Sequence, residues 1–160
     1  MATSQIEIHI LSGIRDATDP PGLLWVGARP FLTFDGTTDE LLTWTFRLPV
    51  DYASGLTVKW QYSMASATTN NVAVRSQIMA VSSGGTINVD SYDTLDKSAD
   101  ATVPGTVGIM DEISFALTNV DSAAAGDYIA VQLGRENGTT GTNATGDMYV
   151  WEIALTYTTV

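Results

Sequence analysis

The sequence predicts an all-β protein whose strands pack as a two-sheet antiparallel β-sandwich. Apolar residues recur at every second position in several short stretches, and a period of two places them on one face of a strand. Turn-forming glycine, aspartate, asparagine and proline separate these stretches. No stretch of ten or more residues has the apolar spacing of a helix. The connections differ greatly in length, which favours an eight-stranded jelly roll. An immunoglobulin-like sandwich is the alternative.

The clearest pair of predicted strands spans residues 41–64. Apolar side chains occupy alternate positions in both halves of this segment, on either side of a break that contains proline, aspartate and glycine. Trp44 and Trp60 fall in the apolar register, so we expect both rings to lie in the core. The segment should therefore form the central wall of the sandwich.

Shorter alternating stretches predict the other strands. We expect them at residues 5–11, 30–34, 71–81, 87–89, near 101–103, and at 113–117, 128–135 and 147–156 or slightly beyond. The last strand is expected to send Tyr149, Trp151, Ile153, Leu155 and Tyr157 to one face and Glu152 to the other. The count of eight or nine strands fits a sandwich that forms one domain over residues 1–160.

Residues 12–31 are expected to form an irregular arm or long loop, because the turn residues Asp16, Asp19, Pro20, Pro21 and Gly22 interrupt the segment. Leu23, Leu24, Trp25 and Val26 form an apolar run inside it. Apolar residues in a long loop need cover. We therefore predict that this run contacts a partner or another subunit, with packing on the chain's own sandwich as the alternative.

Composition excludes several classes of function. The 160 residues include no cysteine, which rules out thiol catalysis, cysteine-ligated zinc and iron–sulfur clusters. The formal net charge of −11 would repel nucleic acid and anionic lipid. The first residues lack a signal-peptide pattern, and no window has the eighteen apolar residues of a membrane span. We therefore expect synthesis in the cytoplasm, and no nucleic-acid or membrane partner.

Catalytic motifs are missing from the sequence. His9 is the only histidine, so neither a catalytic triad nor a multi-histidine metal site can form within one chain, and we expect a structural or solvated side chain. Most carboxylates fall in turns, where they bond to the local backbone. Asp111, Glu112 and Glu152 are the acids near or within strands. We expect no enzymatic activity.

One acidic loop is a candidate calcium site. Asp90, Asp93, Asp96 and Asp100 lie in the least regular part of the chain, and calcium prefers carboxylate oxygens. Their spacing is not that of an EF-hand loop, which has a glycine at its centre and a closing glutamate. The alternative is an exposed acidic loop that binds nothing. No other cofactor is expected.

Aromatic residues allow a sugar-binding surface. Trp25, Tyr52 and Tyr92 lie in predicted loops and are the candidates for exposure. Stacking of such rings on sugars is how carbohydrate-binding β-sandwiches hold their ligands. For Trp44 and Trp60, packing in the core is the favoured interpretation.

Three segments carry a resemblance to a known group of proteins. They are TVKWQYSMASATTNNVAVRSQ, ATVPGTVGIMDEISFALTNVDSAAAGDYIAVQLGRE and TGDMYVWEIALTYTT. Their alternating strands and polar Ser/Thr/Asn/Gly loops resemble the cysteine-free jelly-roll proteins in the virions of tailed bacteriophages. Such proteins decorate or cement the capsid, or form appendages of the head or tail. The resemblance covers residues 41–159 and includes no functional motif.

The resemblance implies a non-catalytic structural protein of the virion. Such a capsid decoration protein binds the major capsid protein or another virion protein as a symmetric homo-oligomer, often a trimer. The alternative from the residues is a carbohydrate-binding or receptor-binding β-sandwich module. The two hypotheses are tested by different experiments: the first by assembly with virion proteins, the second by glycan binding.

Overall fold

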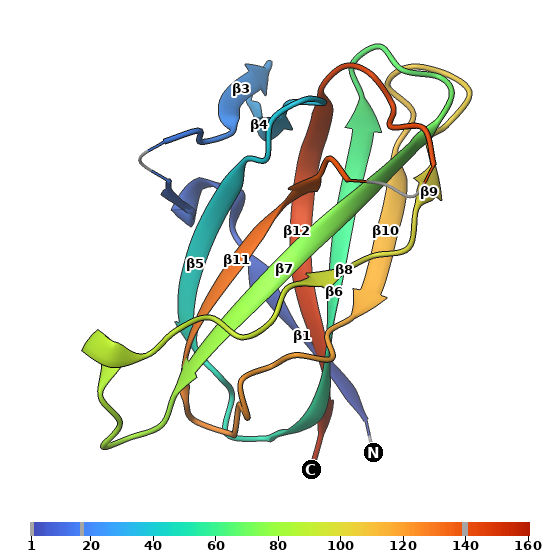
Figure 1. The fold of residues 1–160 in the computed structure, drawn as a ribbon. Helices are drawn as coiled ribbons and strands as arrows, with labels where there is room; N and C mark the ends of the chain where they lie inside the picture. The colour runs from blue at the N-terminus through green and yellow to red at the C-terminus, as the bar shows by residue number, and fades with distance from the viewer. Residues whose placement is uncertain (1, 17, 139–140) are drawn as a thin grey trace.

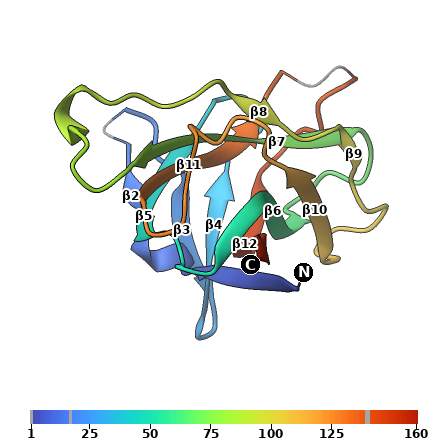
Figure 2. The same ribbon diagram turned by 90° about the horizontal axis from the view of Figure 1, so that it is seen from below.

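In a computed structural model the chain forms two facing antiparallel sheets (Figures 1 and 2). The structure describes residues 2–16, 18–138 and 141–160. Within these residues no α-helix is present, and two short 3₁₀ turns, η1 (Ile10–Ser12) and η2 (Ile87–Val89), interrupt the strands. No helix of the described chain therefore has the length and apolar character needed to cross a membrane.

The first sheet, sheet A, has β12 (Met148–Thr159) at its centre. The order across it is β10 (Asp111–Ala116), β6 (Tyr52–Met64), β12, β4 (Arg29–Phe34) and β3 (Gly22–Val26). A sixth strand, β1 (Thr3–Ile8), pairs with the second half of β12, on the same edge that β4 occupies in the first half. Two strands thus share one edge of β12.

The second sheet, sheet B, is built around β11. The order is β2 (Ile14–Arg15), β5 (Leu41–Arg47), β11 (Tyr128–Glu136), β7 (Asn71–Val81) and β8 (Asp96–Lys97), and β9 (Ala101–Thr102) also pairs with β7. From β4 to β7, and again from β10 to β12, the chain changes sheet after every strand. This alternation gives the strand order of a jelly roll, which confirms the two-sheet sandwich. The short strands β2, β3 and β8 are additional to the predicted ones.

The predicted irregular arm at residues 12–31 is wrong. It contains β2, β3 and the start of β4, and β3 and β4 form a hairpin in which Gly27 turns the chain with a positive φ of 61°. Pairing with β4 gives the backbone of Leu23–Val26 the hydrogen bonds that a loop would lack. The strand predicted at residues 87–89 is also wrong, because that segment is the turn η2.

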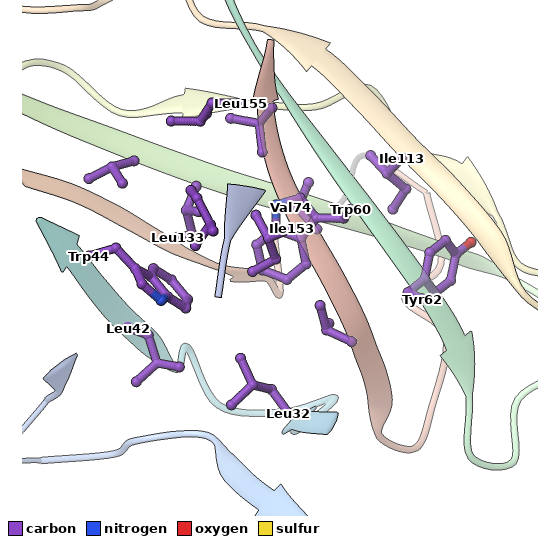
Figure 3. Packing of buried hydrophobic residues seen from close by; sticks show 14 of the residues in the cluster. Leu32, Leu42, Trp44, Trp60, Tyr62, Val74, Ile113, Leu133, Ile153 and Leu155 are labelled. Atoms are coloured by element: carbon purple, nitrogen blue, oxygen red, sulfur yellow. The ribbon is translucent and has the colours of Figure 1, made fainter. Parts of the chain in front are cut away.

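The core confirms the prediction for residues 41–64. β5 and β6 lie in opposite sheets, so their apolar faces meet across the interior. Trp44 is 3% exposed and Trp60 is fully buried, and both belong to one continuous cluster (Figure 3). The indole Nε1 of Trp44 also donates a hydrogen bond to the His9 carbonyl oxygen at 3.1 Å. The two rings are scaffold.

A buried arginine closes one end of the sandwich. Arg135 of β11 has no exposed surface, and its guanidinium donates to the carbonyl oxygens of Gly146 and Ala144 at 2.7 and 2.5 Å. Burial lowers the pKa of Arg135, while the carboxylates of Asp35, Asp147 and Glu40 oppose that shift. Arg135 therefore fixes the loop that leads into β12.

Replacement of Trp60 tests the assignment of the core. Trp60→Ala leaves a large cavity between the sheets and should lower the free energy of unfolding by about 3 to 5 kcal/mol. Urea denaturation measures the loss. Trp25→Ala is the matched control, because Trp25 is 57% exposed and its truncation should cost less than about 1 kcal/mol. Equal losses in the two variants would contradict the assignment.

Candidate functional site

A gap in the pairing of β12 defines the candidate site. β4 pairs with Met148–Val150, and β1 pairs with residues 153–158, so within the described residues Trp151 and Glu152 have no strand beside them on this edge. After Ile8 the chain leaves the edge through His9 and η1, and β4 begins at Arg29 beyond the hairpin turn. The ends of these two strands form the walls of an opening whose floor is β12.

A β-bulge lies at the same place. Opposite β6, Val150 pairs with Tyr62 and Glu152 pairs with Gln61, so Trp151 is the extra residue. Val150 and Ile153 both have no exposed surface and face the interior. The three-residue step between them turns Tyr149 and Trp151 to the outer face of sheet A. The prediction that these two side chains share the face of Ile153 is therefore wrong.

Three aromatic rings cluster on this outer face. The ring centroid of Phe31, from β4, lies 4.7 Å from those of both Tyr149 and Trp151. Phe31 is only 3% exposed, yet it does not belong to the core cluster that contains its neighbour Leu32. The Nε1 of Trp151 donates to the Ser63 hydroxyl at 3.0 Å, which fixes the plane of the indole. The sheet therefore presents a rigid aromatic surface.

The opening beside this surface is a pocket of about 440 Å³. The lining residues come from the end of β1 and η1, from the tip of the β3–β4 hairpin, and from the bulge: Glu7, Ile8, His9, Ile10, Ala28, Arg29, Pro30, Trp151 and Glu152. Apolar groups make up most of the wall, and two carboxylates, a guanidinium and an imidazole add polar groups. This combination is typical of sites for small organic ligands.

His9 has a structural role, as the sequence predicts. Its Nδ1 accepts a hydrogen bond from the Leu11 backbone N–H at 3.3 Å, and its carbonyl oxygen accepts one from the Ser12 hydroxyl at 2.8 Å. Because Nδ1 is the acceptor, the neutral imidazole carries its proton on Nε2. His9 thereby caps η1 and holds one wall of the pocket.

A second, polar hollow of about 240 Å³ continues from the pocket across the outer face of sheet A. Glu152 belongs to both hollows, and the remaining residues are Gln5, Lys59, Gln61, Glu112 and Ala154. Lys59 Nζ lies 3.8 Å from Glu112 Oε1. Glu112 and Glu152, two of the three acids that the sequence places near strands, thus lie on one continuous surface.

The structure does not bring the four candidate calcium ligands together. Asp96 is 8% exposed and accepts hydrogen bonds from the backbone N–H and side chain of both Thr118 and Asn119. Asp93 accepts from the backbone of Thr94 and Asp121, Asp90 from Ser91, and Asp100 from Gly141. In the described parts of the chain no three acidic or histidine side chains are grouped to hold a metal ion.

Asp96 should therefore stabilise the loop without metal. Asp96→Ala removes the acceptor of four hydrogen bonds and should cost roughly 1.5 to 3 kcal/mol of unfolding free energy. Thermal melts with calcium or with a chelator should give one melting temperature for the unmodified protein. A melting temperature that falls on chelation and recovers with calcium would show that the loop binds the ion.

The predicted partner-contact run lies on the hairpin. Leu23 packs against the core cluster, whereas Leu24, Trp25 and Val26 are 50%, 57% and 48% exposed. Exposure is therefore confirmed for Trp25. Tyr52 is only 7% exposed, so the expectation of an exposed loop position is wrong for that residue. The sequence did not reveal that Tyr149 and Trp151 lie on the outer face, with the buried ring of Phe31 packed against them.

Comparisons with known proteins show the fold but no family. No protein-family model matches the sequence, and no curated protein matches it. A family 35 carbohydrate binding module from Clostridium thermocellum is similar in structure, with a TM-score of 0.54, 11% identity, and coverage of 95% of this chain and 97% of that chain. The fold is the β-sandwich of such modules. The CBM22-2 xylan-binding domain of Paenibacillus barcinonensis Xyn10C gives a TM-score of 0.55 at 12% identity, with 94% of each chain covered.

An enzyme from Arthrobacter globiformis T6 contains the same arrangement as one part of a longer chain. Its isomalto-dextranase, in a complex with panose, gives a TM-score of 0.52 at 15% identity over 96% of this chain but only 23% of that chain. At these identities the likeness concerns the fold alone.

Proposed function

We propose that the protein is a non-catalytic carbohydrate-binding module whose ligand occupies the pocket at the bulge of β12. The single observation that carries the proposal is the position of Trp151, which the bulge turns out of the core into a pocket of about 440 Å³. The folds of a family 35 carbohydrate binding module and of a xylan-binding domain support it.

The chemistry of the pocket suits a sugar. A pyranose ring has an apolar face of C–H groups, which packs on an aromatic ring, and a rim of hydroxyls, which need donors and acceptors. Trp151, Ile10 and Pro30 supply the apolar wall, and Glu7 and Glu152 supply carboxylate acceptors. Hydrogen bonds to such charged groups are stronger than neutral ones.

The polar hollow next to the pocket extends the same surface. Gln61, Lys59 and Glu112 lie beyond Glu152, with side chains that can bond to further hydroxyls. A ligand longer than one sugar ring can therefore contact both hollows. The acidic surface of the protein disfavours anionic polysaccharides, so neutral oligosaccharides are the first ligands to test.

Calorimetric titration with neutral hexasaccharides of xylose, glucose and mannose tests the proposal. One of them should bind, and Trp151→Ala should weaken binding by at least about tenfold, the effect of losing a stacking contact of about 1.4 kcal/mol. Trp25→Ala is the matched control, because Trp25 is exposed on the hairpin without lining the pocket, and it should leave the affinity unchanged.

Two results would contradict this proposal. One is the absence of binding to any neutral oligosaccharide or glycan on an array. The other is binding that Trp151→Ala leaves unchanged while its far-ultraviolet circular dichroism matches that of the unmodified protein.

A structural role in a phage virion is the second candidate. The resemblance of residues 41–159 to virion jelly rolls favours it, and the exposed Leu24, Trp25 and Val26 offer a contact surface. In this proposal the protein decorates the capsid, bound to the major capsid protein or another virion protein. Co-sedimentation with empty capsids of a phage whose genome encodes the chain should then occur in a fixed ratio. Failure to co-sediment would count against this role.

A further inference from the structure

The outer edge of β3 is open. Among the described residues β3 pairs only with β4, so the backbone groups on its other side point away from sheet A. The β3–β4 hairpin extends beyond the body of the sandwich (Figures 1 and 2). An open edge is a template for another strand.

β3 lacks the features that protect the other edges. β10 begins with Asp111 and Glu112, and β1 contains Glu7, so charged side chains lie on both. β2 and β8 are only two residues long. β3 consists of Gly22, Leu23, Leu24, Trp25 and Val26, with no charged residue. Charges and short length are the usual protection of a sheet edge against pairing with another chain.

Apolar side chains continue from this edge along the same side of the sandwich. β2 is the edge strand of sheet B on the side where β3 ends sheet A (Figure 2). Ile14 of β2 is 58% exposed and Leu11 is 47% exposed. With Leu24, Trp25 and Val26 they make five of the large exposed apolar side chains, all within sixteen residues of sequence.

The charge of this side permits contact between two copies. The segment 11–29, which carries these five side chains, contains Arg15, Asp16, Asp19 and Arg29, whose formal charges sum to zero, so the net charge of −11 resides in the rest of the chain. Two molecules that approach through the rest of the chain bring a net acidic surface together. Contact through this segment involves less of that repulsion.

We infer that β3 pairs with β3 of a second copy of this chain in a two-fold dimer. Antiparallel pairing of the five residues about their midpoint places Leu24 on the axis, opposite Leu24 of the partner subunit. The backbone groups of both edges are then satisfied, and the two A sheets become continuous. On the other face of the joined strands Trp25 lies opposite the partner subunit's Leu23.

The apolar area that two copies can bury against each other limits the strength of the dimer. Burial of the five exposed apolar side chains removes roughly 500 Å² per copy, below the about 800 Å² per partner of a standard interface. We therefore expect a weak, reversible dimer.

Sedimentation velocity on the unmodified protein tests the dimer, over concentrations from about 5 to about 500 µM, across which mass action shifts the equilibrium. The sedimentation coefficient should rise from that of a monomer to that of a dimer.

Leu24→Lys and Leu24→Glu should each remain monomeric, because like charges meet on the axis. An equal mixture of the two variants should recover the dimer, because Lys and Glu then lie opposite each other. Val50→Glu, at an 81% exposed position outside the edge, is the control and should dimerise normally.

Hydrogen exchange on the unmodified chain provides a readout without substitutions. The amides of Gly22–Val26 that point away from β4 should exchange more slowly at high concentration than at low concentration. The inference is overturned if the unmodified protein remains a monomer at every concentration, if it forms a trimer, or if the two Leu24 variants do not recover the dimer when mixed.

Discussion

The bulge at Trp151 is the constraint on which the rest of the structure depends. Among the described residues, β12 is the one strand of sheet A that pairs with three others, β6 on one side and β4 and β1 on the other. Extra length at Trp151 allows both Val150 and Ile153 to face the core, so the apolar register continues through the strand. The same extra residue lies at the gap between β4 and β1, where the pocket opens.

The tryptophans therefore divide between the core and the proposed binding site. Trp44 and Trp60 fill the interior between the sheets, whereas Trp151 belongs to an aromatic cluster on the outside that the core does not include. A ring held by Phe31 and by the Ser63 hydroxyl loses little conformational entropy on contact with a ligand. The β3–β4 hairpin belongs to both proposals, because its tip forms one wall of the pocket and its outer strand is the proposed dimer contact. Two pockets in one dimer would increase the avidity for a polymer.

Much of the fold is predictable from alternation, because residues 41–64 and 71–81 keep a period of two and their strands face a core on one side. The bulge is not predictable in this way. Residues 148–151 read Met-Tyr-Val-Trp, so either phase looks apolar, and the only sign is the charge of Glu152 one position later. β3 is not predictable because Pro20, Pro21 and Gly22 indicate a turn, and a strand of five residues is too short for alternation to stand out. The hydrogen bonds of Asp96 are not predictable from the sequence either, because their donors, Thr118 and Asn119, lie 22 and 23 residues further along the chain.

The central claim is that the bulge makes Trp151, and neither core tryptophan, part of a carbohydrate site. Nuclear magnetic resonance of the four ¹⁵N-labelled indole groups during titration with the oligosaccharide that binds tests it most directly. The account predicts a progressive shift of the Trp151 indole signal that saturates with binding, while the Trp44 and Trp60 signals stay in place. An unmoved Trp151 signal at saturation, or a shift confined to Trp25, would contradict it.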